Sequence, residues 1–149
     1  MNRARMMTYA KDRRVLDVFS YIGGWGIQAA VAGAASVTCL DSSAAALEHM
    51  QHNAALNQVA DRIDSQKGDA FELMKQLIDD KQRYDMVIVD PPAFIKRRKD
   101  MKQGEAAYQR INQLAMRLLS DDGLLISASC SQHFSRDQLL RAINRAAGE

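Results

Sequence analysis

One stretch of this sequence constrains the fold more than any other: an apolar run, a glycine-rich turn and an alanine-rich run, in that order. The apolar run, Val15–Ser20, reads as a β-strand that contains one carboxylate, Asp17. The alanine-rich run, from about Trp25 to Ala32, has the pattern of a helix. The turn between them holds Gly23, Gly24 and Gly26. Because glycine has no Cβ atom, such a turn lets the backbone approach a ligand closely, against the N-terminus of the helix. The stretch therefore predicts a nucleotide-type cofactor site.

Strand and helix patterns alternate along the rest of the chain. The expected strands are Val15–Ser20, Ser36–Leu40, Arg62–Lys67, Tyr84–Val89 and Leu124–Ser129. The expected helices are Arg3–Arg14, Trp25–Ala32, a segment from Ser42 or Ser43 to Leu56, Phe71–Asp80, Glu105–Leu119 and Ser135–Ala147. A polar basic loop is expected at 96–104 and a turn at Asp121–Gly123. This alternation predicts an α/β fold, with a mostly parallel sheet of about five strands and helices on both faces. We expect this fold to form one domain over residues 1–149.

Composition limits the classes of protein to which this chain can belong. Apolar residues make up 47% and charged residues 26% of the chain, as is usual for a globular domain. The net charge of +2 is too small to indicate nucleic-acid binding by itself. No apolar stretch reaches the roughly 18 to 20 residues that a membrane span needs. The cysteines do not suggest a disulfide framework, and the histidines lack the spacing of metal ligands. We therefore expect a cytoplasmic protein without a membrane or metal partner.

Five notable residues each come just after the carboxyl end of an expected strand. They are Gly23, Asp41, Asp69, Asp90 and Cys130. Because the carboxyl ends of parallel strands meet at one edge of a sheet, we expect these residues to form one site. Asp41 could accept both hydroxyl groups of a ribose, or could cap the following helix. Asp69 could contact an adenine amino group, or could cap the helix that begins near Ala70. The glycines, likewise, could serve only a turn between strand and helix.

The segment Asp90-Pro91-Pro92-Ala93-Phe94 is a more specific signal than the glycine turn. Two successive prolines after a buried strand fix the backbone as a rigid, extended turn. Such a turn can present carbonyl groups and an aromatic ring to a flat heterocycle. The cations that follow, Lys96 and Arg97 among them, suit contact with phosphate groups, although a solvated surface loop is nearly as good an interpretation.

These motifs together resemble the catalytic domain of the class I S-adenosylmethionine-dependent methyltransferases, which have a Rossmann-like fold. The resemblance rests on Asp17-x-Phe19-Ser20-Tyr21-x-Gly23-Gly24, Asp41, Gly68-Asp69, Asp90-Pro91-Pro92-x-Phe94 and Ser129-Cys130-Ser131. It covers nearly the whole chain and is strongest to the bacterial family that methylates cytosine C5 in large-subunit (23S) ribosomal RNA. Members of that family also carry an amino-terminal RNA-binding module and two further strands beyond the last helix. We therefore expect this chain to be a fragment of a longer protein.

The resemblance implies a role for each motif residue. The residues expected to bind S-adenosyl-L-methionine are Asp17, Phe19, Ser20, Tyr21, Gly23, Gly24, Asp41, Ser42, Asp69, Ala70, Asp90 and Pro91. Those expected to bind the RNA substrate are Pro92, Phe94, Lys96, Arg97 and Tyr108. Cys130 is the expected nucleophile, with 23S ribosomal RNA as the partner.

The chemistry of cytosine methylation explains why a cysteine is needed. Cytosine C5 is a poor nucleophile until a thiolate adds to C6 and places electron density on C5. Such a thiolate requires a partly exposed, polar setting. Cys130, between two serines at the end of a strand, fits this setting, whereas Cys39 lies in an apolar strand and suits the core. Asp90 is the nearest candidate for the base that removes the C5 proton.

Other functions remain open at the level of the sequence. Asp-Pro-Pro followed by an aromatic residue also suits methylation of a purine (guanine or adenine), a reaction that needs no thiol. The glycine pattern alone would suit a nicotinamide-dependent oxidoreductase, and a non-catalytic binding scaffold is a third alternative. The strand Leu124–Ser129 is expected at an exposed sheet edge, which predicts self-association or low stability.

Overall fold

The computed structural model describes residues 2–148 of the chain. Its strands are β1 (Arg14–Val18), β2 (Ser36–Asp41), β3 (Ile63–Lys67), β4 (Tyr84–Val89) and β5 (Leu119–Ser127). Its helices are α1 (Asn2–Met7), α2 (Gly24–Val31), α3 (Ala44–Leu56), α4 (Ala70–Asp79), α5 (Met101–Arg117) and α6 (Arg136–Ala147). Short 3₁₀ turns lie at η1 (Ala60–Arg62) and η2 (Arg98–Asp100). Strands and helices alternate, as the sequence predicts.

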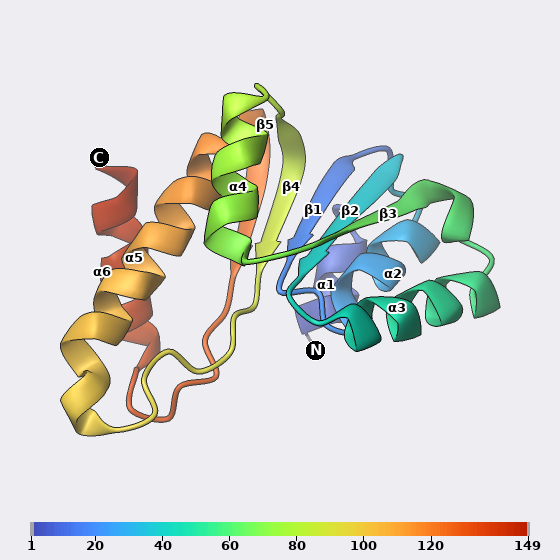
Figure 1. The fold of residues 1–149 in the computed structure, drawn as a ribbon. Coiled ribbons are helices and arrows are strands. Elements are labelled where there is room, and N and C mark those ends of the chain that lie inside the picture. The colour runs from blue at the N-terminus through green and yellow to red at the C-terminus, as the bar shows by residue number, and fades with distance from the viewer. Residues whose placement is uncertain (1, 149) are drawn as a thin grey trace.

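All strand pairs of the sheet are parallel, in the order β3-β2-β1-β4-β5 (Figure 1). The chain proceeds outward from β1 to β3 and then returns to the other side of β1 with β4. The strand order therefore reverses between β1 and β4. In open α/β sheets, ligands bind at the carboxyl ends of the strands beside such a reversal. The segments that follow β4 and β5 run side by side below the sheet in Figure 1.

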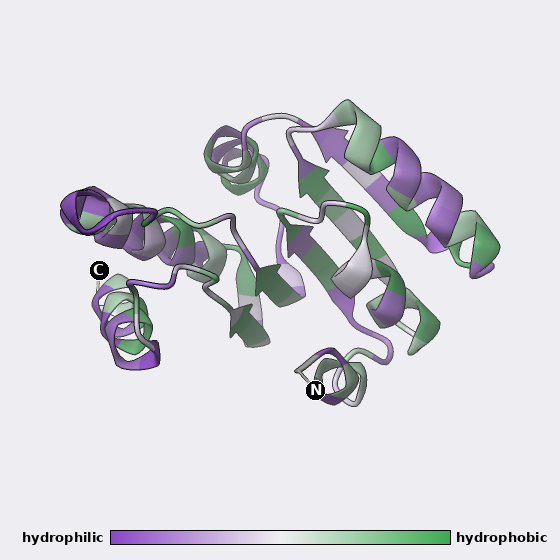
Figure 2. Cartoon of the chain, turned by 90° about the horizontal axis from the view of Figure 1, so that it is seen from below, coloured by the Kyte–Doolittle hydropathy of each residue, from purple (hydrophilic) through white to green (hydrophobic). Residues whose placement is uncertain are grey.

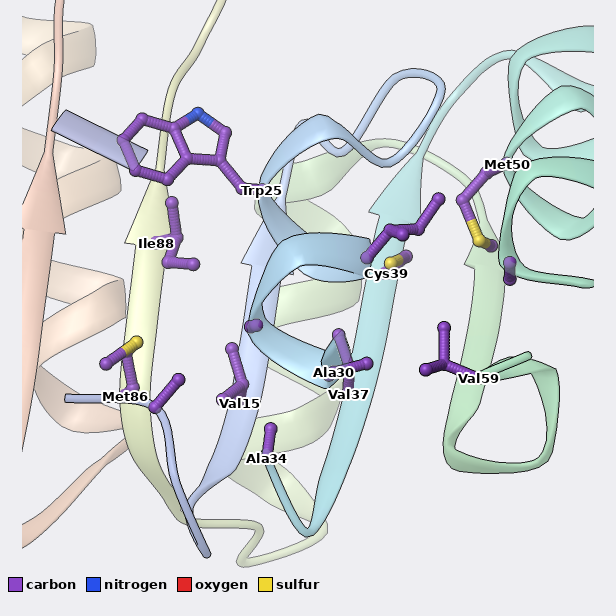
Figure 3. Packing of buried hydrophobic residues seen from close by; sticks show 14 of the residues in the cluster. Val15, Trp25, Ala30, Ala34, Val37, Cys39, Met50, Val59, Met86 and Ile88 are labelled. Carbon is purple, nitrogen blue, oxygen red and sulfur yellow. The ribbon is translucent and has the colours of Figure 1, made fainter. Parts of the chain in front are cut away.

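Helices cover both faces of the sheet, so the central strands are buried on both sides. The apolar cluster on one face joins α2 and α3 to side chains of β1, β2 and β4, and Figure 3 shows Trp25 and Val15 within it. The cluster on the other face joins α4 and α5 to the alternate side chains of the same strands. A third, smaller cluster packs α6 against α5. In Figure 2 the helices carry both purple and green, as expected for helices with one buried side.

The first helix is shorter than the sequence predicts. An Arg3–Arg14 helix was expected, but α1 ends at Met7 and β1 begins at Arg14. Asp12 has a φ of 62°, which a helix cannot contain, and its N–H donates to the Gly33 carbonyl at 2.9 Å. This long-range hydrogen bond favours a turn where the local sequence, polar and free of proline, favours a helix.

The basic segment 96–104 is not entirely a loop. Helix α5 begins at Met101, four residues before the expected start at Glu105, and contains Gly104. Gly104 is buried, and a Cβ atom there would collide with the side chain of Ile95. Glycine lowers helix propensity, which is why the sequence pattern places the helix start after it. The structure uses the glycine instead for the close packing of α5 on the chain that follows β4.

The expected turn at Asp121–Gly123 lies inside β5. Tyr84 pairs with Leu119, but Met86 pairs with Leu124, so β5 is irregular between these two pairs. Asp121, Asp122 and Gly123 form a local pattern that indicates a turn. In the structure these residues form the irregular part of β5 instead. The other expected elements agree with the structure to within about two residues at each end.

Candidate functional site

The loop after β1 adopts an uncommon backbone conformation. Phe19 and Tyr21 have φ values of 61° and 51°, and Gly23 has a φ of 89°. Positive φ is rare for residues with side chains, and it persists where the surroundings enforce it. Here the Ser20 N–H donates to the Leu40 carbonyl at 2.9 Å, which holds the loop against the end of β2.

The side chain of Asp41, at the end of β2, stabilises this loop by hydrogen bonds. Its Oδ2 accepts the N–H of Tyr21 at 2.8 Å, and its Oδ1 accepts the N–H of Ser43 at 2.9 Å. The Asp41 carbonyl accepts the N–H of Gly68 at 3.0 Å, so the ends of β1, β2 and β3 are joined through one residue. Asp41 is partly exposed, and each carboxylate oxygen retains a second lone pair for a ligand.

Asp17 lies behind the glycine turn rather than on its open surface. Its side chain has no exposed area, and its Oδ2 accepts the N–H of Gly26 at 2.9 Å. Its Oδ1 is buried without a hydrogen-bond partner in the described chain. Burial raises the pKa of Asp17 from 3.8 to about 7; the Gly26 N–H opposes this change, and the charge of Asp90 adds to it. Asp17 thus orders the glycine turn through the backbone of Gly26.

Trp25 and Asp90 link the first helix after the turn to the end of β4. The indole Nε1–H of Trp25 donates to Asp90 Oδ2 at 2.9 Å. Figure 3 shows the Trp25 ring above Ile88 of β4. The hydrogen bond fixes the orientation of the Asp90 side chain. Trp25 was assigned only to a helix by its sequence pattern, because a contact across 65 positions leaves no local signal.

Phe94 brings the segment after β4 against the loop after β1. Its ring centroid lies 6.1 Å from that of Phe19 and 6.1 Å from that of Phe71. It lies 4.8 Å from the ring centroid of Tyr108 in α5. Pro91 is buried, whereas Pro92 is exposed. The two expected binding regions are therefore in contact through aromatic rings.

Cys130 also lies at this edge. Its Sγ is 3.5 Å from the carbonyl oxygen of Pro91, to which the thiol donates a weak hydrogen bond, and the residue is exposed. Cys39, in contrast, has no exposed area in β2. Burial, and secondarily the charge of Asp17, raises the pKa of the Cys39 thiol well above its usual value. This agrees with the sequence-based assignment of Cys39 to the core.

Tyr108 is buried and packs against the segment that contains Cys130. The expected substrate residue has no exposed area, and its ring stacks on Phe134 at 4.6 Å. Its hydroxyl group is 2.6 Å from Ser131 Oγ, and it accepts the hydroxyl of Ser129 at 2.9 Å. Ser131 Oγ in turn accepts the N–H of Ile95 at 3.2 Å. Tyr108 therefore holds the segment with Cys130 beside the segment with Pro91.

The remaining expected site residues lie at the edges of this region. Asp69 is exposed and caps α4, because its Oδ2 accepts the N–H of Glu72 at 3.1 Å. Ala70 is buried. Ser42 is exposed, and it is Ser43 that caps α3. Lys96 and Arg97 are exposed, and Arg97 forms an ion pair of 3.4 Å with Asp100.

The edge of the sheet thus joins the loop after β1, Asp41, Asp90, Pro91 and Cys130 through direct contacts. Within residues 2–148, histidine, cysteine and acidic side chains form no group suited to a metal ion. No helix of this part of the chain is long and apolar enough to cross a membrane.

Curated proteins are similar to this chain in sequence. "Ribosomal RNA large subunit methyltransferase I" from Tolumonas auensis is 37% identical over 147 residues, which are 98% of this chain and 37% of that protein. This chain therefore spans little more than a third of the curated relatives that it matches.

Solved structures of methyltransferases have the same fold. The structure of SMU.776 complexed with SAH (S-adenosylhomocysteine) matches with a TM-score of 0.86 and 23% identity, over 97% of this chain and 38% of that one. The SAM-dependent methyltransferase from Agrobacterium tumefaciens matches with a TM-score of 0.82 and 21% identity, over 97% of this chain and 48% of that one. The α/β, Rossmann-like methyltransferase fold implied by the sequence motifs is confirmed.

A family model covers almost the entire chain. The model described as "Conserved hypothetical protein 95" matches residues 4–142, which include every strand and every expected site residue. The chain belongs to this family, and it has the fold of the class I S-adenosylmethionine-dependent methyltransferases.

Proposed function

We propose that this chain is the catalytic domain of an S-adenosylmethionine-dependent methyltransferase that forms 5-methylcytosine in large-subunit ribosomal RNA. The observation that carries the proposal is the position of Cys130. Its sulfur lies 3.5 Å from the Pro91 carbonyl, at the same edge as the loop after β1. A nucleophile and a cofactor loop must meet at one edge for this reaction.

The residues at the edge suit S-adenosylmethionine chemically. The cofactor has a sulfonium and an ammonium group, and carboxylates of Asp41 and Asp90 lie at the ends of β2 and β4. Asp41 retains lone pairs with which it can accept ribose hydroxyl groups. Asp69 and Ala70 would lie beside the adenine, and Pro91 beside the reacting methyl group. When bound, the cofactor supplies the methyl group.

The side chains of this chain perform the remaining chemistry. The Cys130 thiolate forms a bond to cytosine C6, and the electron pair of the 5,6 double bond moves toward C5. After C5 has received the methyl group, Asp90 accepts the proton that C5 loses. The bond between C6 and sulfur then breaks, which restores the double bond and the thiolate. The net products are 5-methylcytosine, S-adenosylhomocysteine and a proton.

An RNA substrate agrees with the surface next to this site. Lys96 and Arg97 are exposed directly after the segment with Phe94, where they can contact phosphate groups. The target base must leave its stack to reach Cys130. Pro92, which is exposed, and Phe94 would then lie against it. The curated relatives carry the name of a ribosomal RNA large subunit methyltransferase, which supports 23S ribosomal RNA as the partner. A cytoplasmic location is part of the same proposal.

The test is methyl transfer from labelled S-adenosylmethionine to large-subunit ribosomal RNA, followed by digestion to nucleosides. We expect label in 5-methylcytidine with the wild-type chain and none with Cys130→Ala. Cys39→Ala is the matched control, because Cys39 is buried in the core, and it should retain activity. Label in a methylated purine, or full activity in Cys130→Ala, would contradict cytosine as the target and favour guanine or adenine.

We also propose that this chain self-associates through β5. In residues 2–148, β5 pairs with β4 on one side and with no strand on the other. A groove of about 320 Å³ beside it is lined by α1, Tyr9, Leu124 and Ile126. Unpaired backbone groups and apolar side chains at a sheet edge favour pairing with another chain. Light scattering should detect dimers or larger species; a monodisperse monomer with a high melting temperature would contradict this.

A further inference from the structure

Trp25 is the only tryptophan of the chain and lies in the first turn of α2. It is buried, with only 8% of the residue exposed. Its ring packs in the apolar cluster above Ile88 of β4, as Figure 3 shows. The guanidinium group of Arg3, from α1, lies over the same ring, with Cζ 5.7 Å from the ring centroid. Contacts from two other elements therefore hold the indole in one position.

The polar edge of this ring is directed at Asp90. The indole Nε1–H donates to Asp90 Oδ2 at 2.9 Å. An indole has one N–H group and accepts no hydrogen bond, so this contact satisfies the only polar atom of the buried ring. Asp90 follows directly after β4 and is partly exposed. The two oxygens of its carboxylate are therefore not equivalent, because the indole engages Oδ2.

Asp90 is also close along the chain to the contact that the proposed nucleophile makes. The thiol of Cys130 donates to the carbonyl oxygen of Pro91 at 3.5 Å, and Pro91 is the residue that follows Asp90. Pro91 is buried, and its ring restricts the backbone. The connection between Asp90 and the contact with Cys130 is therefore short and rigid. A group that fixes the rotation of the Asp90 carboxylate also fixes its oxygens relative to the sulfur.

We propose that Trp25 is a positioning residue for proton removal: by engaging Oδ2, it turns Oδ1 of Asp90 toward C5 of the methylated cytosine. The inference rests on the proposed function, in which Asp90 accepts this proton. Oδ1 forms a bond to the proton, and the electron pair of the C5–H bond restores the 5,6 double bond. The bond between C6 and sulfur breaks, and its electron pair returns to sulfur. A base must lie within hydrogen-bond reach of its proton, and Trp25 acts by holding Asp90 in that geometry.

The test follows the covalent intermediate in Trp25→Phe, which keeps an aromatic ring and removes the N–H donor. Proton removal comes after sulfur has bound C6 and the methyl group has been transferred, so a misplaced Asp90 should delay only the release of the RNA. With S-adenosylmethionine and ordinary RNA, turnover should fall roughly 10-fold to 100-fold. The methylated adduct between RNA and Cys130 should accumulate, as measured by denaturing electrophoresis and mass spectrometry. With RNA that contains 5-fluorocytidine, which has no proton at C5, the adduct should form at the wild-type rate.

Further variants separate positioning from a structural role. Ile88→Val loosens the packing below the indole without removing its hydrogen bond, and it should not cause the adduct to accumulate. Asp90→Asn keeps an oxygen acceptor for the indole but cannot take up the proton. Adding Trp25→Phe to Asp90→Asn should therefore cause no further loss of turnover. The indole N–H of the only tryptophan gives one NMR signal, which should move upfield in Asp90→Asn because the acceptor loses its charge.

Wild-type turnover in Trp25→Phe, a loss of turnover without accumulated adduct, or an additive loss in the double variant would overturn the role of Trp25. Equally slow trapping of RNA that contains 5-fluorocytidine would also overturn it, because this result shows a structural role only. If Trp25→Phe fails to fold, an indole signal that does not move in Asp90→Asn has the same consequence. A wild-type chain that transfers no methyl group to cytosine would instead overturn the proposed function, and this inference with it.

Discussion

Asp17 shows how a single buried charge can shape the site. One carboxyl oxygen accepts the N–H of Gly26, and the other has no hydrogen-bond partner in the described chain. A carboxylate in such a place is costly, so burial favours the protonated form and raises the pKa of Asp17 to about 7. The residue orders the glycine turn at a cost in folding stability near neutral pH.

The first prediction concerns the pH dependence of stability. The pKa of Asp17 rises from 3.8 to about 7 on folding, so the folded state binds more protons between these values. The contribution of Asp17 to the free energy of unfolding therefore falls as the pH rises from about 4 to about 7. Asp17→Asn keeps an acceptor for the Gly26 N–H without the charge. Its melting temperature should exceed that of the wild type at about pH 8, by a margin that shrinks as the pH is lowered toward about 4.

The matched control for this measurement is Asp64→Asn, an exposed carboxylate in β3. Its melting temperature should follow that of the wild type at every pH. A constant difference between Asp17→Asn and the wild type would show that Asp17 does not change its protonation on folding.

A second prediction concerns Tyr108. Tyr108→Phe removes the hydroxyl that is bonded to Ser129 and Ser131 on either side of Cys130. Leaving these serines with fewer partners should cost about 1–3 kcal/mol of stability in urea denaturation. Because Cys130 is then less well held beside Pro91, methyl transfer should slow by roughly 10-fold to 100-fold. The affinity for S-adenosylmethionine should stay unchanged.

Tyr9→Phe, at a tyrosine that is 50% exposed, is the control and should alter neither quantity. If Tyr108 instead contacts the substrate, Tyr108→Phe should raise KM for RNA, with kcat unchanged.

At the scale of elements, α5 depends on close packing against the segment after β4. A Cβ atom at Gly104 would collide with Ile95, which belongs to the cluster that includes Tyr108 and Phe134. Gly104→Ala should therefore destabilise the fold by about 1–3 kcal/mol, although alanine favours helices over glycine. Equilibrium urea denaturation measures this difference. Gln103→Ala, at an exposed position of the same helix, should change stability by less than about 0.5 kcal/mol. Stabilisation by Gly104→Ala would show that α5 can move away from Ile95.

The elements that the sequence predicts well are those with strong local patterns. β4 has a continuous apolar run buried on both faces, and its bounds, Tyr84–Val89, are those expected. The ends of α1 and α5 depend instead on distant contacts, from Asp12 to Gly33 and from Gly104 to Ile95. Local helix propensity contains no information about such contacts. The predicted end of α1 and the predicted start of α5 were therefore wrong.

At the scale of the whole molecule, the parallel arrangement of the strands made the location of the candidate site predictable. Once the strands are known to be parallel, the residues after them must lie at one end of the sheet, which is where Asp41, Asp90 and Cys130 are found. The partners of these residues were not predictable. Trp25 and Arg3 reach the edge through contacts whose geometry exists only in the folded chain. The complete burial of Asp17 and Tyr108 was likewise not predictable from the local sequence.

The central claim is that a cytosine meets the Cys130 sulfur at the edge where the cofactor loop ends. RNA that contains 5-fluorocytidine tests it most directly, because fluorine at C5 cannot leave as a proton does, and the bond between sulfur and C6 persists. With S-adenosylmethionine present, mass spectrometry should find the RNA nucleotide attached to the peptide that contains Cys130. An adduct on Cys39, or none while methyl transfer to ordinary RNA proceeds, would contradict the account.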